Sequence, residues 1–399
     1  MSQVTCLEDA PFIDLSDPSL SVRSQPIKDV RAQSWFARTP YGIAVLRYAD
    51  MRNLLLHRSL RQGSHEWPAY NNVSGVFSDW WSRTILVQEG ADHERLRRLV
   101  NPAFSPSIIS AMKPDFAALA KELVDGFAGS GSCDFMADFA DPYASRVICH
   151  VLGLPRDEAD RVLKLSATMG LALGLSFKEN EVRINEATVG MYAYADELVA
   201  NRRNDPGDDF MSNLVAASEG GDRLSDQELR DMILMLVFAG IDTTRNQLGL
   251  GMATFLDHPD QWHLLAERPE LAAQAVEEVM RVRPTITWVT RQAIKDFEYN
   301  GLTIKKGTTL HLLAEAAGTD EAVYDADFDI TAERKRHFGF GGGMHHCLGH
   351  AIARSDMAIA LEVLPPKLRN VRSAGPGEWL PDSGNTGAIS LPIAFDPAQ

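Results

Sequence analysis

One stretch of the chain, from Met232 to Ile241, is apolar at every position. A helix that is apolar on all sides has no face for solvent and has to pass through a core. The stretch is too short to cross a bilayer, which takes about 20 apolar residues. It follows Ser225 and Glu228, whose side chains can each satisfy a backbone donor of the other residue in a capping box. We therefore expect a helix that begins near Ser225 and crosses the interior of a large fold.

The rest of the chain alternates between helical patterns and short strand patterns. Helical periodicity covers 91–203, with Pro and Gly breaks, 269–282 and 348–364, and a further helix is expected at 49–56. Strand patterns cover 42–47 and 297–313, with a hairpin turn at Asn300-Gly301. The stretches 61–85 and 320–340 show no period, and we expect irregular loops there. This balance predicts a mainly α fold with small β-sheets.

Composition places limits on the organisation and the partners of the chain. No linker or internal repeat divides the 399 residues, so we expect a single domain over 1–399. The net charge of −15 argues against nucleic acid as a partner. The first residues lack the pattern of a signal peptide or membrane anchor. The four cysteines are scattered, which fits a reducing, cytoplasmic setting without disulfides.

The densest chemical signal is the stretch from His337 to His350, in which four glycines precede Cys347. Glycine allows the tight turns that such a loop needs. A helix is expected directly after Cys347, and the free N–H groups and dipole at a helix start favour an anion. Such a setting lowers the pKa of a thiol, and a thiolate is a ligand that suits haem iron.

Two other interpretations of this loop stay open. Histidines flank Cys347, so a zinc site is conceivable, although no second cysteine and no usual ligand spacing accompany them. The plainest alternative is a glycine-rich turn around a buried cysteine, because free cysteines are often core residues.

An acid and two hydroxyls stand within the apolar helix, in the sequence Ala239-Gly240-Ile241-Asp242-Thr243-Thr244. Polar groups in such a place are costly unless they are used or paired. One interpretation is a threonine that bonds back to the helix carbonyls. The functional interpretation is a proton relay, in which Asp242 carries protons in from solvent and Thr243 hydrogen-bonds oxygen or a water beside it.

Charged pairs at helical spacing complete the set of candidate residues. Glu278 and Arg281 share a helix face, and by themselves they read as an exposed salt bridge. His93 and Arg97 are four apart on another helix, and Arg291 precedes the hairpin. Cationic or hydrogen-bonding groups like these are needed wherever carboxylates are buried.

Together these motifs resemble those of the soluble bacterial branch of the cytochrome P450 superfamily, in the order in which that family carries them. The resemblance extends from about Gly42 to the C-terminus. It departs from the usual pattern at Gly342 and His350, and at Gly318-Thr319-Asp320, where relatives often have an Asn-Arg-Asp triplet. The resemblance implies the P450 fold, a single domain shaped like a triangular prism.

The family pattern assigns a role to each motif. Cys347 is implied as the axial ligand of a haem b iron, and Asp242 and Thr243 as the catalytic relay. Glu278 and Arg281 are implied as a buried structural pair. The implied cofactor-binding residues are His93, Arg97, Arg291, Phe340, Gly341, His345, Cys347 and Gly349.

The resemblance also implies a reaction and its partners. We expect a monooxygenase that inserts one oxygen atom from O2 into a hydrophobic small molecule, by hydroxylation or epoxidation, as in bacterial secondary metabolism. The chain contains no flavin or iron–sulfur signature, so we expect a separate ferredoxin and ferredoxin reductase to supply electrons to a monomer. The expected substrate-pocket residues are Val237, Ala239, Gly240, Ile286, Trp288, Val289 and Thr386. The basic residues suggested for ferredoxin docking are Arg95, Arg98, Lys335 and Arg336.

Three alternatives remain open on the sequence. A peroxide-driven haem-thiolate enzyme would not need the acid–hydroxyl pair. A haem sensor would not need a substrate pocket. A helical protein without haem would leave the cysteine loop without a chemical role.

Overall fold

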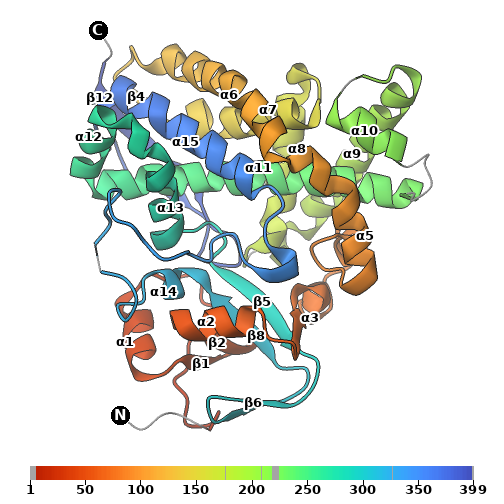
Figure 1. Cartoon of the computed structure of the whole chain (residues 1–399), viewed down its shortest axis with the longest axis vertical. Helices are drawn as coiled ribbons and strands as arrows, with labels where there is room; N and C mark the ends of the chain where they lie inside the picture. The colour runs from red at the N-terminus through yellow and green to blue at the C-terminus, as the bar shows by residue number, and fades with distance from the viewer. Residues whose placement is uncertain (1–5, 176, 208, 218–223, 326, 398–399) are drawn as a thin grey trace.

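Helix α11 (Asp226–Asp257) forms the centre of the fold, and the other elements are arranged around it (Figure 1). The computed structural model describes residues 6–397, except for 176, 208, 218–223 and 326. The capping box predicted at Ser225 and Glu228 is confirmed, with both reciprocal hydrogen bonds present. All side chains from Met232 to Phe238 are buried, so the helix crosses the core as its apolar run predicts.

Helices make up most of the described structure. Helix α11 packs against α7, α8, α9 and α13, and α15 packs against α6 and α13. The helices other than α11 are α1 (Gln25–Gln33), α2 (Tyr48–Leu55), α3 (Trp67–Tyr70), α4 (Val76–Arg83), α5 (Gly90–Val100), α6 (Pro106–Phe127), α7 (Asp141–Leu152), α8 (Ala159–Gly170), α9 (Phe177–Asn204), α10 (Phe210–Ala217), α12 (Pro259–Glu267), α13 (Ala272–Val282), α14 (Ala314–Gly318) and α15 (His350–Lys367).

The strands form small sheets. The largest sheet has the order β1-β2-β8-β5-β3, in which only β2 and β8 are parallel. It lies with α1, α2 and α14 in the lower half of Figure 1, below α11. The strands are β1 (Phe36–Thr39), β2 (Gly42–Val45), β3 (Leu60–Gln62), β4 (Ser132–Asp134), β5 (Trp288–Ala293), β6 (Phe297–Tyr299), β7 (Leu302–Ile304), β8 (Thr309–Leu313), β9 (Arg369–Ser373), β10 (Glu378–Trp379), β11 (Ala388–Ser390) and β12 (Pro392–Asp396). The expected mainly α fold with small β-sheets is confirmed.

Two local predictions have different outcomes. The hairpin turn is confirmed, because Asn300 (φ 47°) and Gly301 (φ 81°) join β6 to β7 through left-handed backbone. The irregular loop expected over 61–85 is wrong in part, since it contains α4. Phe77, Trp80 and Trp81 are buried on one face of this helix. Their spacing of three and four residues is helical, but the many aromatic residues around them obscured this period in the sequence.

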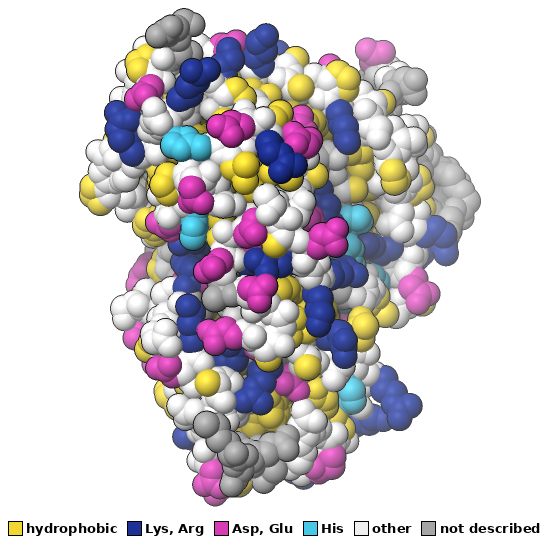
Figure 2. Space-filling model, turned by 60° about the vertical axis from the view of Figure 1, so that its left-hand side comes forward, with side chains coloured by type: hydrophobic (Ala, Val, Ile, Leu, Met, Phe, Trp, Pro, Cys, Tyr) yellow, Lys and Arg dark blue, Asp and Glu magenta, His cyan; other side chains and the backbone are white. Residues whose placement is uncertain are grey.

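The surface carries charge of both signs. On the face drawn in Figure 2, acidic and basic side chains are interspersed instead of gathering by sign. In the described part of the chain, no helix combines the length and the apolar character that a membrane span requires.

Candidate functional site

A cavity of about 1040 Å³ lies between α11, the large sheet and the cysteine loop. Its size is at the upper limit of the 300–1,000 Å³ that pockets for drug-sized ligands usually have. Its wall is mainly apolar and aromatic, with Phe238 and Ala239 from α11 and Trp288 and Val289 from β5. The space is therefore suited to a large apolar group.

The cysteine loop closes on itself at one wall of this cavity. Its backbone turns through left-handed conformations at Gly341 (φ 63°) and Gly343 (φ 72°), where glycine is the favoured residue. The Gly341 N–H donates to the Phe338 carbonyl (2.8 Å), and the Cys347 N–H donates to the Phe340 carbonyl (3.1 Å). Cys347 lines the cavity and its exposed surface faces this interior space, so the thiol is presented to the cavity.

The electrostatic setting of Cys347 has opposing contributions. Burial raises the pKa of the Cys347 thiol, while the Gly349 N–H and the charges of Arg97 and Arg354 lower it. Helix α15 begins at His350, two residues later than the sequence predicted, and Gly349 is its N-terminal flanking residue. The backbone N–H of Gly349 therefore supplies the hydrogen bond to the Cys347 thiol that we expected from the start of a helix.

Close packing accounts for glycine at two of the positions that depart from the family pattern. A Cβ at Gly342 would lie 2.6 Å from the Leu55 Cδ2, so Leu55 occupies the space that a side chain at position 342 would need. A Cβ at Gly318 would lie 2.3 Å from the Arg281 carbonyl oxygen, a backbone atom that cannot easily yield. Glycine therefore permits close packing of Gly342 in the cysteine loop against Leu55, and of Gly318 against Arg281.

Four nitrogen-bearing side chains named from the sequence meet at the cavity wall. They are His93, Arg97, Arg291 and His345. The rings of His93 and His345 lie 4.4 Å apart, and Arg97 Nη2 donates to the His346 carbonyl (3.0 Å). His345 Nε2 is 3.2 Å from Glu89 Oε1, an acid that the sequence analysis missed.

Two of these side chains, Arg291 and His93, are short of partners. Arg291 is 5% exposed, and within the described part of the chain its guanidinium donates to the backbone carbonyls of Leu55, Thr290 and Gly342. Burial lowers the pKa of Arg291 to about 10. His93 Nδ1 is buried without a hydrogen-bond partner in the described part of the structure. Buried cations and donors of this kind require an anion, so this wall fits a ligand with carboxylates, such as the propionates of haem.

Behind the cysteine loop, Glu278 and Arg281 form a buried ion pair. Arg281 Nε and Nη2 donate to the two oxygens of Glu278 (2.7 and 2.6 Å), and both side chains are at most 2% exposed. Arg281 also donates to the carbonyls of Gly318 and Asp327. The pair thus joins α13 to the segment that precedes the cysteine loop.

The neighbouring Glu277 was not singled out from the sequence. Its carboxylate is 3.1 Å from His337 Nε2 and accepts from Arg354 Nε (2.6 Å). These two hydrogen bonds lower the pKa of Glu277 to about 2, against the cost of burial. Arg354 in turn stacks over Phe340, with 4.3 Å between its guanidinium carbon and the ring centroid. Only spatial proximity links these residues, so sequence spacing could not reveal them.

Asp242 and Thr243 both line the cavity from α11, but their contacts differ from the expectation. Thr243 Oγ1 donates to the Ala239 carbonyl (2.7 Å), which is the back-bonded arrangement. Asp242 is 2% exposed and therefore has no direct contact with bulk solvent. It accepts from Arg245 Nε (3.2 Å) and from Asn385 Nδ2 (2.5 Å), two partners that the sequence analysis missed.

The predicted pocket residues divide into two groups. Ala239, Gly240, Ile286, Trp288 and Val289 line the cavity. Val237 and Thr386 do not, so these two predictions are corrected. Val237 is fully buried in the hydrophobic core on another side of α11. Thr386 turns its hydroxyl toward the Leu380 carbonyl and Asp382. Apolar wall residues that the sequence analysis missed are Phe104, Ile148, Leu173, Phe177, Met235 and Ile352.

The basic residues suggested for docking a ferredoxin differ in their exposure to solvent and in their ion pairs. Arg98, Lys335 and Arg336 are exposed, whereas Arg95 forms an ion pair with Glu228.

Across the described part of the chain, no group of three or more His, Cys, Asp or Glu side chains is arranged to hold a metal ion. The zinc interpretation of the cysteine loop thus gains no support.

Comparisons with known proteins agree with this arrangement. A family model described as cytochrome P450 matches residues 173–364. The chain is 38% identical to luteothin monooxygenase of Streptomyces thioluteus, over 98% of this chain and 97% of that protein. It is 33% identical to the mycinamicin IV hydroxylase/epoxidase of Micromonospora griseorubida, over 96% and 98% of the two chains. The crystal structure of CalO2 superposes with a TM-score of 0.88 at 30% identity, covering 96% of this chain and 99% of that one. The chain belongs to the cytochrome P450 family and is a haem-dependent monooxygenase.

Proposed function

We propose that Cys347 would hold the iron of a haem b bound in the cavity, and that the enzyme oxidises a hydrophobic secondary metabolite. The observation that carries this proposal is the combination of one inward-facing thiol with a cavity wall that carries His93, Arg97, Arg291 and His345, among which Arg291 is a buried cation bonded to backbone carbonyls and His93 Nδ1 is buried without a hydrogen-bond partner among the described residues. Phe340, Gly341 and Gly349 lie on the cysteine side and complete the cofactor pocket.

We assign the propionates to His93, Arg97, Arg291 and His345. A buried carboxylate needs paired charge or several hydrogen bonds, and these side chains offer both. Among the residues that the structure describes, Arg291 is a buried cation without a carboxylate contact, and His93 has a ring nitrogen without a hydrogen-bond partner. Glu278 and Arg281 hold the supporting segment in place and take no part in the chemistry.

When bound, the haem activates O2, so that one oxygen atom enters the substrate and the other leaves as water after the uptake of two electrons and two protons. The protein contributes binding, orientation and proton delivery. The apolar wall excludes water and orients the substrate. Asp242 and Thr243 lie next to each other on the same wall, where Asp242 holds a proton and the Thr243 hydroxyl passes it into the cavity.

The proposed electron-transfer partners are inferred from the lack of a flavin or iron–sulfur signature in the sequence and from exposed basic residues. A separate ferredoxin and its reductase supply the electrons to a monomeric enzyme in the cytoplasm. Arg98, Lys335 and Arg336 are the exposed cations suggested for docking an acidic ferredoxin. The printed activities of the relatives, a monooxygenase and a hydroxylase/epoxidase, support hydroxylation or epoxidation as the reaction.

The test is turnover with ferredoxin, ferredoxin reductase and isotopically labelled O2, using luteothin and a panel of other hydrophobic compounds. We expect one labelled oxygen atom per product molecule. Product formed equally well from hydrogen peroxide alone would favour a peroxygenase. Absence of both product and ligand-induced changes in the haem spectrum across the panel would favour a haem sensor.

The relay has its own test in Thr243→Ala. The substitution removes the hydroxyl beside Asp242. We expect the fraction of consumed electrons that appears in product to fall about a hundredfold, the low end of what a positioned proton donor contributes. The measurement compares O2 consumed with product formed. Unchanged coupling would remove Thr243 from the relay.

A further inference from the structure

The Asp242 carboxyl is enclosed by side chains from several distant segments. Arg245 contacts one oxygen and Asn385 the other. Arg245 also pairs with Asp141 of α7 (3.1 Å). A Cβ at Gly170 of α8 would lie 2.8 Å from three atoms of the Asp242 carboxyl group, so α8 closes the remaining side. Whether Asp242 is ionised or protonated, its hydrogen bonds therefore have to come from these few neighbours.

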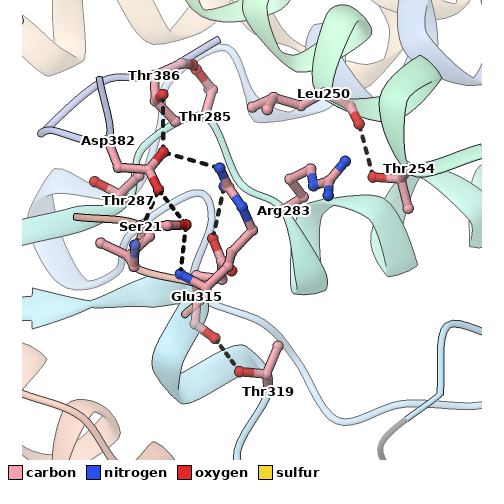
Figure 3. Close-up of polar contacts among 12 residues, drawn as sticks. Ser21, Leu250, Thr254, Arg283, Thr285, Thr287, Glu315, Thr319, Asp382 and Thr386 are labelled. Atoms are coloured by element: carbon pink, nitrogen blue, oxygen red, sulfur yellow. Dashed lines mark hydrogen bonds and ion pairs between the residues drawn. The ribbon is translucent and has the colours of Figure 1, made fainter. Parts of the chain in front are cut away.

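Asn385 belongs to the segment 380–387, in which Asp382 is held by several polar contacts (Figure 3). Asp382 accepts from the Ser21 hydroxyl (3.0 Å), the Val22 N–H (3.0 Å) and Arg23 Nη2 (3.1 Å). On the other side, the Thr287 hydroxyl donates to the Ser383 carbonyl. A segment held in this way keeps the Asn385 backbone in place while its side-chain amide remains able to rotate.

The hydrogen bonds around Asn385 can be satisfied in two ways. The Thr285 hydroxyl has one hydrogen and two acceptors within reach, Asn385 Oδ1 (2.9 Å) and the Thr386 carbonyl (2.7 Å). With the amide in this orientation, Asn385 Nδ2 donates to an ionised Asp242. With the amide turned over, Nδ2 donates to Thr285 Oγ1, and Thr285 keeps the Thr386 carbonyl. Asn385 Oδ1 then faces Asp242 and needs a hydrogen, which a protonated Asp242 supplies.

We propose that Asn385 is a positioning residue for the proton relay, whose amide donates to the Asp242 carboxylate and, turned over, accepts from the Asp242 carboxylic acid. Asn385 itself gains and loses no proton. Burial raises the pKa of Asp242, while Arg245 and Asn385 lower it, so the surroundings act on both forms of the acid. Asp141 is the other acid near Arg245, and its pKa is also raised by burial. This inference rests on the relay role proposed for Asp242.

The experiment replaces Asn385 with leucine, which has a similar size but no hydrogen-bonding group, in the wild type and in Asp242→Asn. Ser390→Ala is the matched control, because it removes a hydrogen bond to Asp134 from the nearby strand β11 and does not touch Asp242. All variants are studied as haem-loaded enzymes, with the thermal midpoint and the carbon monoxide spectrum as checks of folding.

Two readouts are needed. The first is coupling, the product formed per O2 consumed with luteothin, measured across pH. We expect Asn385→Leu to lower coupling about tenfold and to shift its pH profile, and Ser390→Ala to match the wild type. In the Asp242→Asn background, we expect Asn385→Leu to cause little further loss of coupling.

The second readout is the carboxylic acid band of Asp242 in the infrared spectrum of the resting enzyme, assigned by its loss in Asp242→Asn. We expect Asn385→Leu to move this band to higher wavenumber, because its hydrogen bond is lost.

The outcomes separate the two proposals. If Asp242→Asn uncouples the reaction but Asn385→Leu leaves coupling and the infrared band unchanged, the role of Asn385 is overturned and the relay stands. An equal loss from Asn385→Leu with and without Asp242 also overturns it, because Asn385 would then act through the fold. If Asp242→Asn leaves coupling intact, the relay itself fails, and the role of Asn385 fails with it.

Discussion

The cysteine loop and the surroundings of Asp242 occupy the same cavity but have opposite electrostatic character. Near the loop, Arg97 and Arg291 line the cavity, and Glu277 has its pKa lowered to about 2 by His337 and Arg354. In the other region, burial raises the pKa of Asp242, and it raises to about 7 the pKa of Glu315, which shares Arg23 with Asp382 of the Asn385 segment. One region favours bound anions and the other favours acids that keep a proton. A cofactor with propionates and a proton relay need these two environments respectively.

The largest expected effect concerns the structural support of the cysteine loop. Arg281→Ala removes the bidentate partner of the buried Glu278 and leaves it the longer contact with Arg334 (3.4 Å), so we expect a loss of about 3 kcal/mol in the free energy of unfolding. The matched control is Arg268→Ala, whose pair with Glu270 is more than half exposed, with an expected loss of about 0–1 kcal/mol. Denaturant unfolding measures both. Equal losses in the two variants would mean that burial of the pair has no energetic consequence.

The second prediction uses the opposite pKa shifts of Glu315 and Glu277. The folded-state pKa of Glu315 is raised from 4.5 to about 7, so its contribution to stability is present below 4.5 and is lost as the pH rises through 7. Glu315→Gln should remove this fall in the free energy of unfolding, which amounts to up to about 3 kcal/mol between pH 4.5 and about pH 7.

Glu277 should behave in the opposite way. Its folded-state pKa is lowered from 4.5 to about 2, so its contribution is present above 4.5 and is lost as the pH falls toward 2. Its side chain is 41% exposed, so solvent screening limits the effect to about 1 kcal/mol. Unfolding free energies of Glu277→Gln and Glu315→Gln measured across pH test both signs. The same pH dependence in both variants would contradict the electrostatic contrast between the two regions.

The third prediction separates cofactor binding from folding. Arg291→Leu removes a buried cation whose contacts are backbone carbonyls, so we expect the haem-free protein to become more stable and the affinity for haem to fall about tenfold or more. Thermal unfolding of both forms and the rate of haem transfer to an acceptor protein measure the two effects. A haem-free protein destabilised as much as the holoenzyme would assign Arg291 to the fold instead of the cofactor.

The smallest expected effect concerns the space around Asp242. Gly170→Ala places a Cβ within 2.8 Å of the carboxyl group, and we expect a loss of about 1 kcal/mol in stability together with weaker coupling. Gly126→Ala is the control in α6, where none of the described residues has an atom within 4 Å of the added Cβ, and it should stabilise the protein by about 0.5–1 kcal/mol. A neutral Gly170→Ala variant would mean that Asp242 can move freely.

The two regions also differ in how much of them the sequence predicts. The cysteine loop is contiguous, so its glycines, Cys347 and the following helix can be read from one stretch of residues. The long core helix is equally local, because the apolar run and the capping box lie within its own sequence. Both therefore emerge from local physical rules.

The partners of Asp242 could not be predicted in this way. Asn385 is 143 positions away, and Asp382 is tied to Ser21 at a separation of 361 positions. No periodicity connects residues at such distances, and only the folded chain brings them together. The same holds for Glu277, whose spacing gives no sign of His337 or Arg354. The single-domain organisation expected from the sequence stays a prediction.

The most direct test of the proposed cofactor site is the visible spectrum of the reduced, haem-loaded protein with carbon monoxide, recorded for the wild type and for Cys347→His. We predict a Soret band at the long-wavelength position of thiolate ligation in the wild type. In Cys347→His we predict a band at the position of histidine-ligated haem, in a protein that remains folded. A wild-type band at the histidine position, or a thiolate band that persists in Cys347→His, would contradict Cys347 as the ligand.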